Sequence, residues 1–222
     1  MSQLTTSARA EGGVLQPRQQ QTPLSLKRST NYFAQRMIKC SERCRFHSLA
    51  ELYYAALLEG NPLVEYFCPQ PFLFYVNGER YIPDVYVVKN GRRLVIEIRS
   101  KKRFSEHKRT ALDSYLSLRN IQFDVISNDS IYEQEITAQN WLTILRHMLS
   151  GQDIDTDGAE TELIEALQLA PSMAFGDIVD VGHRQANERN ELAVYRLFYQ
   201  GIVETNLETS FLSYDSELVL CI

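Results

Sequence analysis

The hydrophobic positions that follow residue 48 recur first with a helical period. Leu49, Tyr53, Ala56 and Leu57 fall on one face of a helix, and Gly60-Asn61-Pro62 supplies residues that end one. The sequence therefore predicts a helix that begins near residue 49 and stops at the Gly-Asn-Pro tripeptide.

The pattern then changes to short runs rich in β-branched and aromatic residues. Such runs cover residues 72–76, 81–88 and 94–98, and the dipeptides Asn77-Gly78 and Asn90-Gly91 separate them. Asn-Gly is preferred in two-residue hairpin turns because both positions accept a positive φ. These residues therefore predict a meander of three strands.

Helical and strand-like segments alternate through the rest of the first 150 residues. A helix is predicted over residues 103–118, a buried strand over residues 121–126, and a helix in two pieces over residues 131–148. A further helix is expected over residues 32–44. The order helix, three strands, helix, strand, helix indicates an α/β domain in which helices flank a mixed β-sheet.

A change in composition separates a second domain. Residues 150–158 are small, acidic and bounded by glycine, which is typical of a linker. Beyond the linker, helices are predicted over residues 159–169, 172–181 and 188–200, and short strands over residues 202–204, 210–213 and 217–221. Three helices followed by a small hairpin outline a winged-helix domain, which we expect over residues 159–222.

Charge is unevenly distributed along the chain, whose net charge is −5. Residues 1–48 and residues 92–109 each carry eight Lys or Arg and two acids, whereas residues 150–222 carry fourteen acids and three arginines. Basic segments favour nucleic-acid phosphates through counterion release, although a charge run is often only a solvated face. The acidic segment would repel DNA and suits a basic protein partner. Residues 1–30 are polar and contain two prolines, and are expected to be a disordered basic arm.

The sequence has no sign of a membrane segment. No apolar run approaches the roughly 20 residues that cross a bilayer, and residues 1–22 have no apolar core of a secretory signal. We therefore expect no membrane partner and a cytoplasmic location.

The four cysteines, Cys40, Cys44, Cys68 and Cys221, are expected to be reduced in that compartment. Cys40, Cys44 and His47 resemble half of a zinc site. The second ligand pair is missing, so packed cysteines beside a surface histidine are the preferred interpretation.

Two acidic residues of the second and third predicted strands can meet at one point. Asp84 follows Pro83 within the second strand and Glu97 lies near the end of the third, so a hairpin brings their carboxylates together. With the backbone carbonyl of Ile98 they form an oxygen ligand set that suits Mg²⁺ or Mn²⁺. Such an ion polarises a phosphate and activates water. Arg99, on the same strand face as Glu97, would stabilise the charge that develops on the phosphate.

A basic stretch follows these residues immediately. Candidates for contacts with DNA phosphates are Lys101, Lys102, Arg103 and Lys108. Pro-Asp, Glu-x-Arg and a following basic helix form the pattern of the PD-(D/E)xK nucleases. The alternative interpretation is a solvent-facing Asp84 and Glu97 that pair with nearby arginines.

Several short motifs occur in the order of a known family. They are His47-Ser48-Leu49-Ala50-Glu51, Asn61-Pro62, Gln70-Pro71, Tyr81-x-Pro83-Asp84, Asn90-Gly91 and Val95-x-Glu97. Together they resemble the N-terminal nuclease domain of TnsA-type transposon endonucleases. The winged-helix outline is similar to the C-terminal domain of that family. The resemblance implies a restriction-endonuclease-like fold over residues 31–149.

The resemblance implies roles for the matching residues. Glu51 would be a catalytic acid carried by the first helix, and Asp84 and Glu97 would be the metal ligands. Glu51 has a competing interpretation, because Ser48-x-x-Glu51 is also a capping box. Gln70 matches a recurring family position and is assigned to structure rather than chemistry.

One position departs from the family pattern. Arg99 occupies the place of a lysine, keeps its charge and can clamp a phosphate, but cannot act as a general base. Three interpretations remain open: Arg99 substitutes electrostatically, Lys101 or Lys102 reaches into the site, or the site is inactive.

The resemblance also implies a reaction and partners. A TnsA-type subunit cuts the 5′, non-transferred strand of double-stranded DNA at transposon ends. The DDE transposase TnsB cuts and joins the 3′ strand, and the AAA+ regulator TnsC binds the pair; the acidic winged-helix domain would contact such a regulator. The alternatives are a stand-alone restriction or repair nuclease, a catalytically silent assembly subunit, and an acidic winged-helix adaptor whose first domain is a scaffold.

Overall fold

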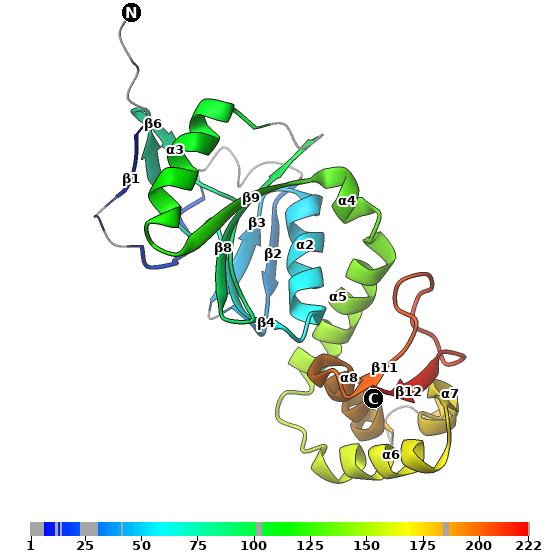
Figure 1. Ribbon diagram of the computed structural model, residues 1–222. Helices are drawn as coiled ribbons and strands as arrows, with labels where there is room; N and C mark the ends of the chain where they lie inside the picture. The colour runs from blue at the N-terminus through cyan, green and yellow to red at the C-terminus, as the bar shows by residue number, and fades with distance from the viewer. Residues whose placement is uncertain are drawn as a thin grey trace, which may run out of the picture. The chain divides into compact units, whose positions relative to one another are not determined.

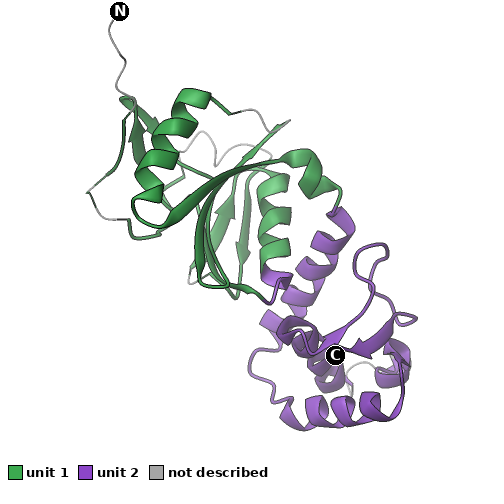
Figure 2. Cartoon of the chain, viewed as in Figure 1, with its two compact units in different colours: residues 1–58, 63–133 green, residues 59–62, 134–222 purple. Residues whose placement is uncertain are grey.

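The chain forms two compact units in the computed structural model. The described residues are 7–11, 13, 15–22, 31–40, 42–100, 104–183 and 187–221. One unit comprises residues 1–58 and 63–133, and the other residues 59–62 and 134–222 (Figure 2). Both units combine helices with β-strands, so the α/β class is confirmed. The division falls after residue 133, whereas the sequence pattern placed the boundary near residue 149.

A four-stranded mixed sheet forms the centre of the first unit (Figure 1). In spatial order its strands are β4 (Val64–Pro69), β7 (Val85–Lys89), β8 (Arg92–Arg99) and β9 (Ile121–Ser127). The first three are antiparallel neighbours, whereas β9 runs parallel to β8. A parallel neighbour requires a crossover connection, which α3 (Glu106–Ser117) supplies.

A second, smaller sheet and α3 share a core with one face of the central sheet. The smaller sheet has the order β1 (Ala8–Ala10), β5 (Phe74–Val76), β6 (Glu79–Tyr81). Burial of large apolar side chains stabilises this arrangement. The buried side chains come from both sheets and from the helix, and include Phe74, Val95, Leu112, Leu116 and Phe123.

The strands predicted for the first unit agree with the structure except where a proline intervenes. Both Asn77-Gly78 and Asn90-Gly91 are hairpin turns whose residues have φ angles between 48° and 85°, as a type I′ turn requires. The predicted strand over residues 81–88 divides at Pro83 into β6 and β7, because proline has no N–H for the ladder. The predicted meander therefore contributes to two sheets, and β4, which the pattern missed, pairs with β7.

A helix and a hairpin precede the central sheet in sequence. The predicted helix is confirmed as α2 (Leu49–Gly60). The helix expected over residues 32–44 is wrong, because β2 (Phe33–Arg36) and β3 (Arg43–Phe46) form an antiparallel pair there. Burial alternates along β3, with Phe46 and Cys44 inside, which is a strand period rather than a helical one.

The described part of the N-terminal segment lies against the first unit, which differs from the disordered arm expected over residues 1–30. Ala8–Ala10 pair with β5 as strand β1. Further along, the N–H groups of Arg18 and Gln20 donate to the carbonyls of Pro71 and Gln70. Composition alone gave no sign of this attachment, because main-chain hydrogen bonds hold much of the segment and its apolar contribution to the core is limited to Ala8, Ala10 and Leu15 among the described residues.

The predicted two-piece helix is confirmed as α4 (Asn128–Tyr132) and α5 (Glu135–Ser150). The second of these belongs to the second unit, where it contacts α8 (Glu188–Gln200). The contact explains why the division precedes α5. Taken over the described residues, no helix combines the length and the apolar character needed to cross a membrane.

The remaining elements of the second unit are short. They are the helices α6 (Asp157–Leu169), α7 (Phe175–Ile178) and η2 (Val181–His183), and the strands β10 (Met173–Ala174), β11 (Val203–Glu204) and β12 (Glu217–Leu220). The strands form an antiparallel sheet in the order β10-β12-β11. The strand predicted over residues 210–213 is wrong, and β10 was not predicted.

Asn140 of α5 explains why residues 210–213 are not a strand. Its side chain is buried and its amide donates to the carbonyls of Leu207 and Ser210, at 2.9 and 2.8 Å. Its Oδ1 accepts the N–H of Leu212 at 2.9 Å. One side chain thus satisfies three backbone groups that a neighbouring strand would otherwise pair.

We expect Asn140→Ala to lower the free energy of unfolding of the second unit by about 2–4 kcal/mol, because it leaves buried backbone groups without partners. Urea denaturation would measure the loss, and hydrogen exchange should show faster exchange at the Leu212 amide. Thr143→Ala is the control, since Thr143 is exposed on the same helix and bonds only to that helix's Gln139 carbonyl. Equal effects of the two substitutions would contradict this account.

Candidate active site

The pairing of β7 with β8 brings Asp84 and Glu97 together. Val85 lies opposite Ile96 in the antiparallel register, so Asp84, one residue before β7, lies beside Glu97. The Oδ2 atom of Asp84 accepts the N–H of Ile98 at 2.6 Å. The predicted hairpin therefore gathers these residues at the end of β8.

Glu97 is the most deeply buried acid of the group, with 1% of its surface exposed. The hydroxyl of Tyr81 donates to its Oε2 at 2.5 Å, and Arg99 forms an ion pair with its Oε1. The Arg99 side chain is 49% exposed, so the other nitrogens of its guanidinium group reach solvent. The alternative interpretation, acids paired with arginines, describes the ion pair but not the burial.

Glu51 lies in the first turn of α2 and forms a variant of the predicted capping box, in which its carboxylate accepts the N–H of His47 rather than that of Ser48. Its Oε2 accepts the N–H of His47 at 3.0 Å, and its N–H donates to the Ser48 hydroxyl at 3.1 Å. The same hydroxyl donates back to Oε1 at 3.0 Å. One contact goes beyond a capping box, because Gln70 Nε2 donates to Glu51 Oε2 at 2.8 Å.

The three carboxylates are close enough to perturb one another. Burial raises the pKa of Asp84 well above its ordinary value, and the charges of Glu97 and Glu51 raise it further. Burial also raises the pKa of Glu97, although the hydrogen bond from Tyr81 and the charge of Arg99 oppose that rise. The site therefore holds more negative charge than Arg99 alone compensates.

A small hollow lies between Asp84 of the sheet and α2. Its lining includes Glu51 and Tyr54 from α2 and Asp84 and Ile98 from the strands. Because side chains alternate along a strand, Ile98 points to the face opposite Val95, which packs in the α3 core. The hollow is therefore on the α2 side of the central sheet.

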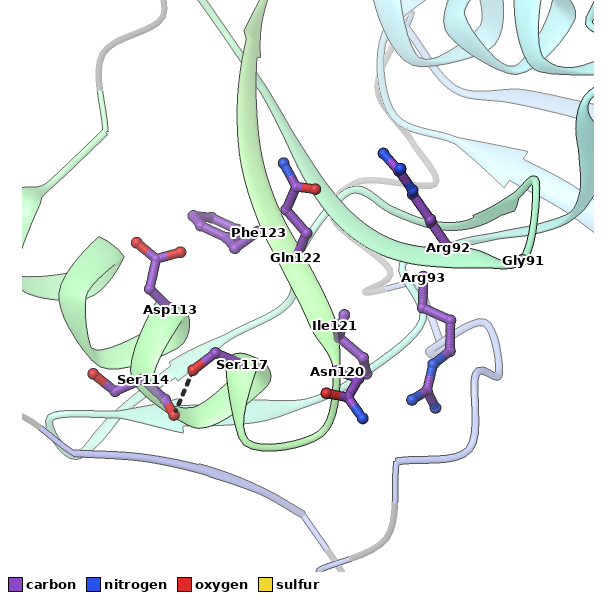
Figure 3. A pocket seen from close by; sticks show the side chains of 10 residues that line it. All are labelled: Gly91, Arg92, Arg93, Asp113, Ser114, Ser117, Asn120, Ile121, Gln122 and Phe123. Carbon is purple, nitrogen blue, oxygen red and sulfur yellow. Dashed lines mark hydrogen bonds between the residues drawn. The ribbon is translucent and has the colours of Figure 1, made fainter.

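A larger pocket lies at the other end of β8 (Figure 3). Arg92 and Arg93 line it, but they leave the strand in opposite directions and do not converge on one point (Figure 3). The Ser114 and Ser117 hydroxyls both donate to carbonyls of their own helix. The polar side chains of this larger pocket do not converge on one point. We therefore place the candidate active site at the acids near the other end of β8.

The donor chemistry of the site fits a divalent cation such as Mg²⁺ or Mn²⁺. Carboxylate oxygens and a backbone carbonyl are the ligands these ions prefer, and a bound cation would oppose the burial that raises the pKa of Asp84 and of Glu97. In this conformation no three His, Cys, Asp or Glu side chains among the described residues converge closely enough to hold a metal. Glu51 faces its own helix cap, and Glu97 faces Tyr81 and Arg99. Asp84, Glu97 and the Ile98 carbonyl are the groups that would hold the ion.

The residues predicted to contact DNA either lie away from this centre or fall outside the described residues. Lys101, Lys102 and Arg103 fall outside the described residues. Lys108 lies on α3, where it forms an ion pair with the exposed Glu79 at 2.8 Å. Such an exposed pair is weak and can exchange for a phosphate.

The cysteines were the other candidate metal ligands. None of the four forms a disulfide with another described residue, and Cys40, Cys44 and Cys68 are buried. Burial, together with the neighbouring Cys40, raises the pKa of Cys68 to about 12, so it is a thiol at neutral pH. The His47 ring lies 3.1 Å from the Thr22 hydroxyl, through its Nε2 atom.

Two site residues were not assigned a chemical role from the sequence. Tyr81 bonds to Glu97, and Gln70 bonds to Glu51. Each stands within a motif that the sequence analysis quoted, but nothing in that spacing shows which acid a tyrosine or glutamine contacts.

Comparison with known proteins assigns neither a family nor a function to the chain. No protein-family model matches the chain, and no curated protein matches it.

We expect Asp84→Asn to raise the free energy of unfolding of the metal-free protein by roughly 1–3 kcal/mol at pH 8. Asparagine keeps an oxygen that can accept the Ile98 N–H, but removes the charge that Glu97 and Glu51 oppose. Chemical denaturation in EDTA would measure the change.

The pH dependence of this gain has a definite sign. Because the folded-state pKa of Asp84 is raised, the folded protein binds a proton that the unfolded chain has released. Wild-type stability then falls as pH rises from near the ordinary value of 3.8 through the raised pKa. The gain from Asp84→Asn should shrink toward zero as pH falls toward 4, and a pH-independent gain would contradict the electrostatic explanation.

Proposed function

We propose that the first unit is a metal-dependent DNA endonuclease of the restriction-endonuclease-like class, and that the chain is a TnsA-type transposase subunit. The gathering of Glu51, Asp84 and Glu97 around the end of β8 carries the proposal. Asp84 and Glu97 are acids with raised pKa values, and Asp84 lines a hollow with Glu51, a combination that is a frequent sign of a functional site.

The topology of the first unit supports the proposal. Along the chain α2, β4, β7, β8, α3 and β9 follow in this order, with β5 and β6 between β4 and β7, and a central sheet of three antiparallel strands and a parallel fourth is compatible with the proposed nuclease core. The acids lie at a strand start and a strand end, held by backbone pairing rather than by a free loop. Such a scaffold positions ligands accurately.

Each residue of the site has a role in phosphodiester hydrolysis. A bound Mg²⁺ would polarise the scissile phosphate and activate water. Asp84, Glu97 and the Ile98 carbonyl would hold it, with Glu51 adding negative charge from the α2 side. Arg99, half exposed, has donors left to bind a phosphate oxygen.

The second unit supports the choice of an assembly subunit over a free nuclease. Its order α5, α6, β10, α7, η2, α8, β11, β12 and its three-stranded sheet are compatible with a winged helix. Residues 150–222 carry fourteen acids against three arginines, so the unit is poorly suited to bind DNA. We assign it to a basic protein partner, in the place of a TnsC-type AAA+ regulator, with the TnsB-type transposase acting on the other strand.

A catalytically silent assembly subunit is the second candidate. The ion pair between Arg99 and Glu97 favours it, because the guanidinium occupies an oxygen that a metal would need. An arginine also cannot accept a proton from water. The two candidates differ in whether DNA cleavage occurs.

We expect 5′-strand cleavage of labelled transposon-end duplex in Mg²⁺ or Mn²⁺, dependent on the partner transposase and lost in Asp84→Ala. Loss of a metal ligand removes the polarising cation, so the rate should fall by at least about 10³-fold. Strand-specific products on a denaturing gel would measure it. Cleavage without the partner would favour a stand-alone nuclease.

The Arg99→Lys variant separates the two candidates. In an active nuclease it should leave the rate within roughly 10-fold of wild type, since the charge is kept while the bidentate geometry is lost. The same gel assay measures this. Absence of cleavage by wild type together with cleavage by Arg99→Lys would identify a silenced subunit instead.

A further inference from the structure

Gln70 stands directly after β4 with a φ of 41°, in the left-handed region. That conformation costs a residue other than glycine roughly 1 kcal/mol. Its side chain is nevertheless buried, with 5% exposed. A glycine would suit this backbone better, so the requirement at this position is for the side chain.

The polar groups of Gln70 bridge two of the site's acidic residues. Its Nε2 donates to Glu51 Oε2 at 2.8 Å, and its main-chain N–H donates to the Asp84 carbonyl at 2.8 Å. A capping box needs neither bond, because His47 and Ser48 already complete it. The hydrogen bond from Gln70 to Glu51 therefore serves a purpose other than helix capping.

The N-terminal segment, residues 19–22, fixes the orientation of the Gln70 amide. Gln19 Nε2 donates to Gln70 Oε1 at 2.6 Å, so the amide must turn its own Nε2 toward Glu51. Gln19 is itself held by the main chain of Arg45, through bonds of 2.7 and 3.2 Å. The amide therefore cannot flip without breaking this chain of bonds.

The same segment also reaches the other donor to Glu51 Oε2. The buried Thr22 hydroxyl lies 3.1 Å from His47 Nε2, and the His47 N–H donates to that oxygen. Both residues that donate to Glu51 Oε2 are thus in contact with residues 19–22.

We infer that Gln70 is a positioning residue for Glu51, and that residues 19–22 are the strap that holds its amide in place. The inference rests on the proposed nuclease function. The Gln70 amide keeps the Glu51 carboxylate on the hollow that also contains Asp84. Without it, rotation of the carboxylate would weaken the site's hold on a divalent cation.

The test compares Gln70→Met, which keeps size and removes the amide, with wild type. Mn²⁺ affinity is measured by electron paramagnetic resonance on the DNA-free protein, and kcat and KM on the cleavage substrate with the partner transposase. We expect Mn²⁺ affinity and kcat to fall by about 10- to 100-fold, with KM for DNA unchanged. Gln19→Ala should give a smaller loss of both.

A second background separates positioning from structural support. In Glu51→Gln no carboxylate remains to be positioned, so adding Gln70→Met should change Mn²⁺ affinity by less than about 2-fold. Equal losses in both backgrounds would overturn the inference, as would unchanged Mn²⁺ affinity in Gln70→Met. Gln122→Ala, exposed on β9 at the far end of the sheet, is the control for unaltered affinity and rate.

The outcomes distinguish this inference from the proposed function. Wild type that neither binds Mn²⁺ nor cleaves DNA would overturn both. Wild type that does both, together with an unaffected Gln70→Met, would overturn only the positioning role. If Gln70→Met does not fold, Gln19→Ala carries the test, and unchanged Mn²⁺ affinity in that variant would count against the strap.

Discussion

The backbone register between β7 and β8 is the constraint on which the site depends. It sets Val85 opposite Ile96, and so puts Asp84 beside Glu97 and within 2.6 Å of the Ile98 N–H. A slip of one residue would turn every side chain of β8 to the other face. The Asn90-Gly91 turn fixes the register locally, because both residues take the positive φ that a two-residue hairpin needs.

Placing Asp84 and Glu97 side by side in a buried position is energetically unfavourable. Neighbouring groups partly offset that cost. Tyr81 and Arg99 stabilise the ionised form of Glu97, and the Ile98 N–H does so for Asp84. These partners lower the pKa values without cancelling the effect of burial. Asp84 and Glu97 therefore keep pKa values above their ordinary range, which is characteristic of a site shaped for a ligand rather than for stability.

Short sequence motifs were sufficient to predict the elements that interactions between neighbouring residues determine. The Asn-Gly turns and the start of α2 at Ser48-x-x-Glu51 follow from short motifs. Pairing between distant segments was not predictable in this way. The attachment of the N-terminal segment to β5 and the buried Asn140 that holds residues 207–212 depend on hydrogen bonds to backbone, which have no sequence signature.

Glu51 shows why capping and catalysis are compatible interpretations of one residue. A capping side chain contributes about 1 kcal/mol to a helix, whereas binding of a divalent cation by several carboxylates exceeds that amount. If Glu51 bound a cation through Oε1, the bonds from His47 and Gln70 to Oε2 could remain, and only the bond from the Ser48 hydroxyl to Oε1 would be lost. The cap and Gln70 thus hold the carboxylate in position, and the loss of one hydroxyl bond is a small cost against cation binding.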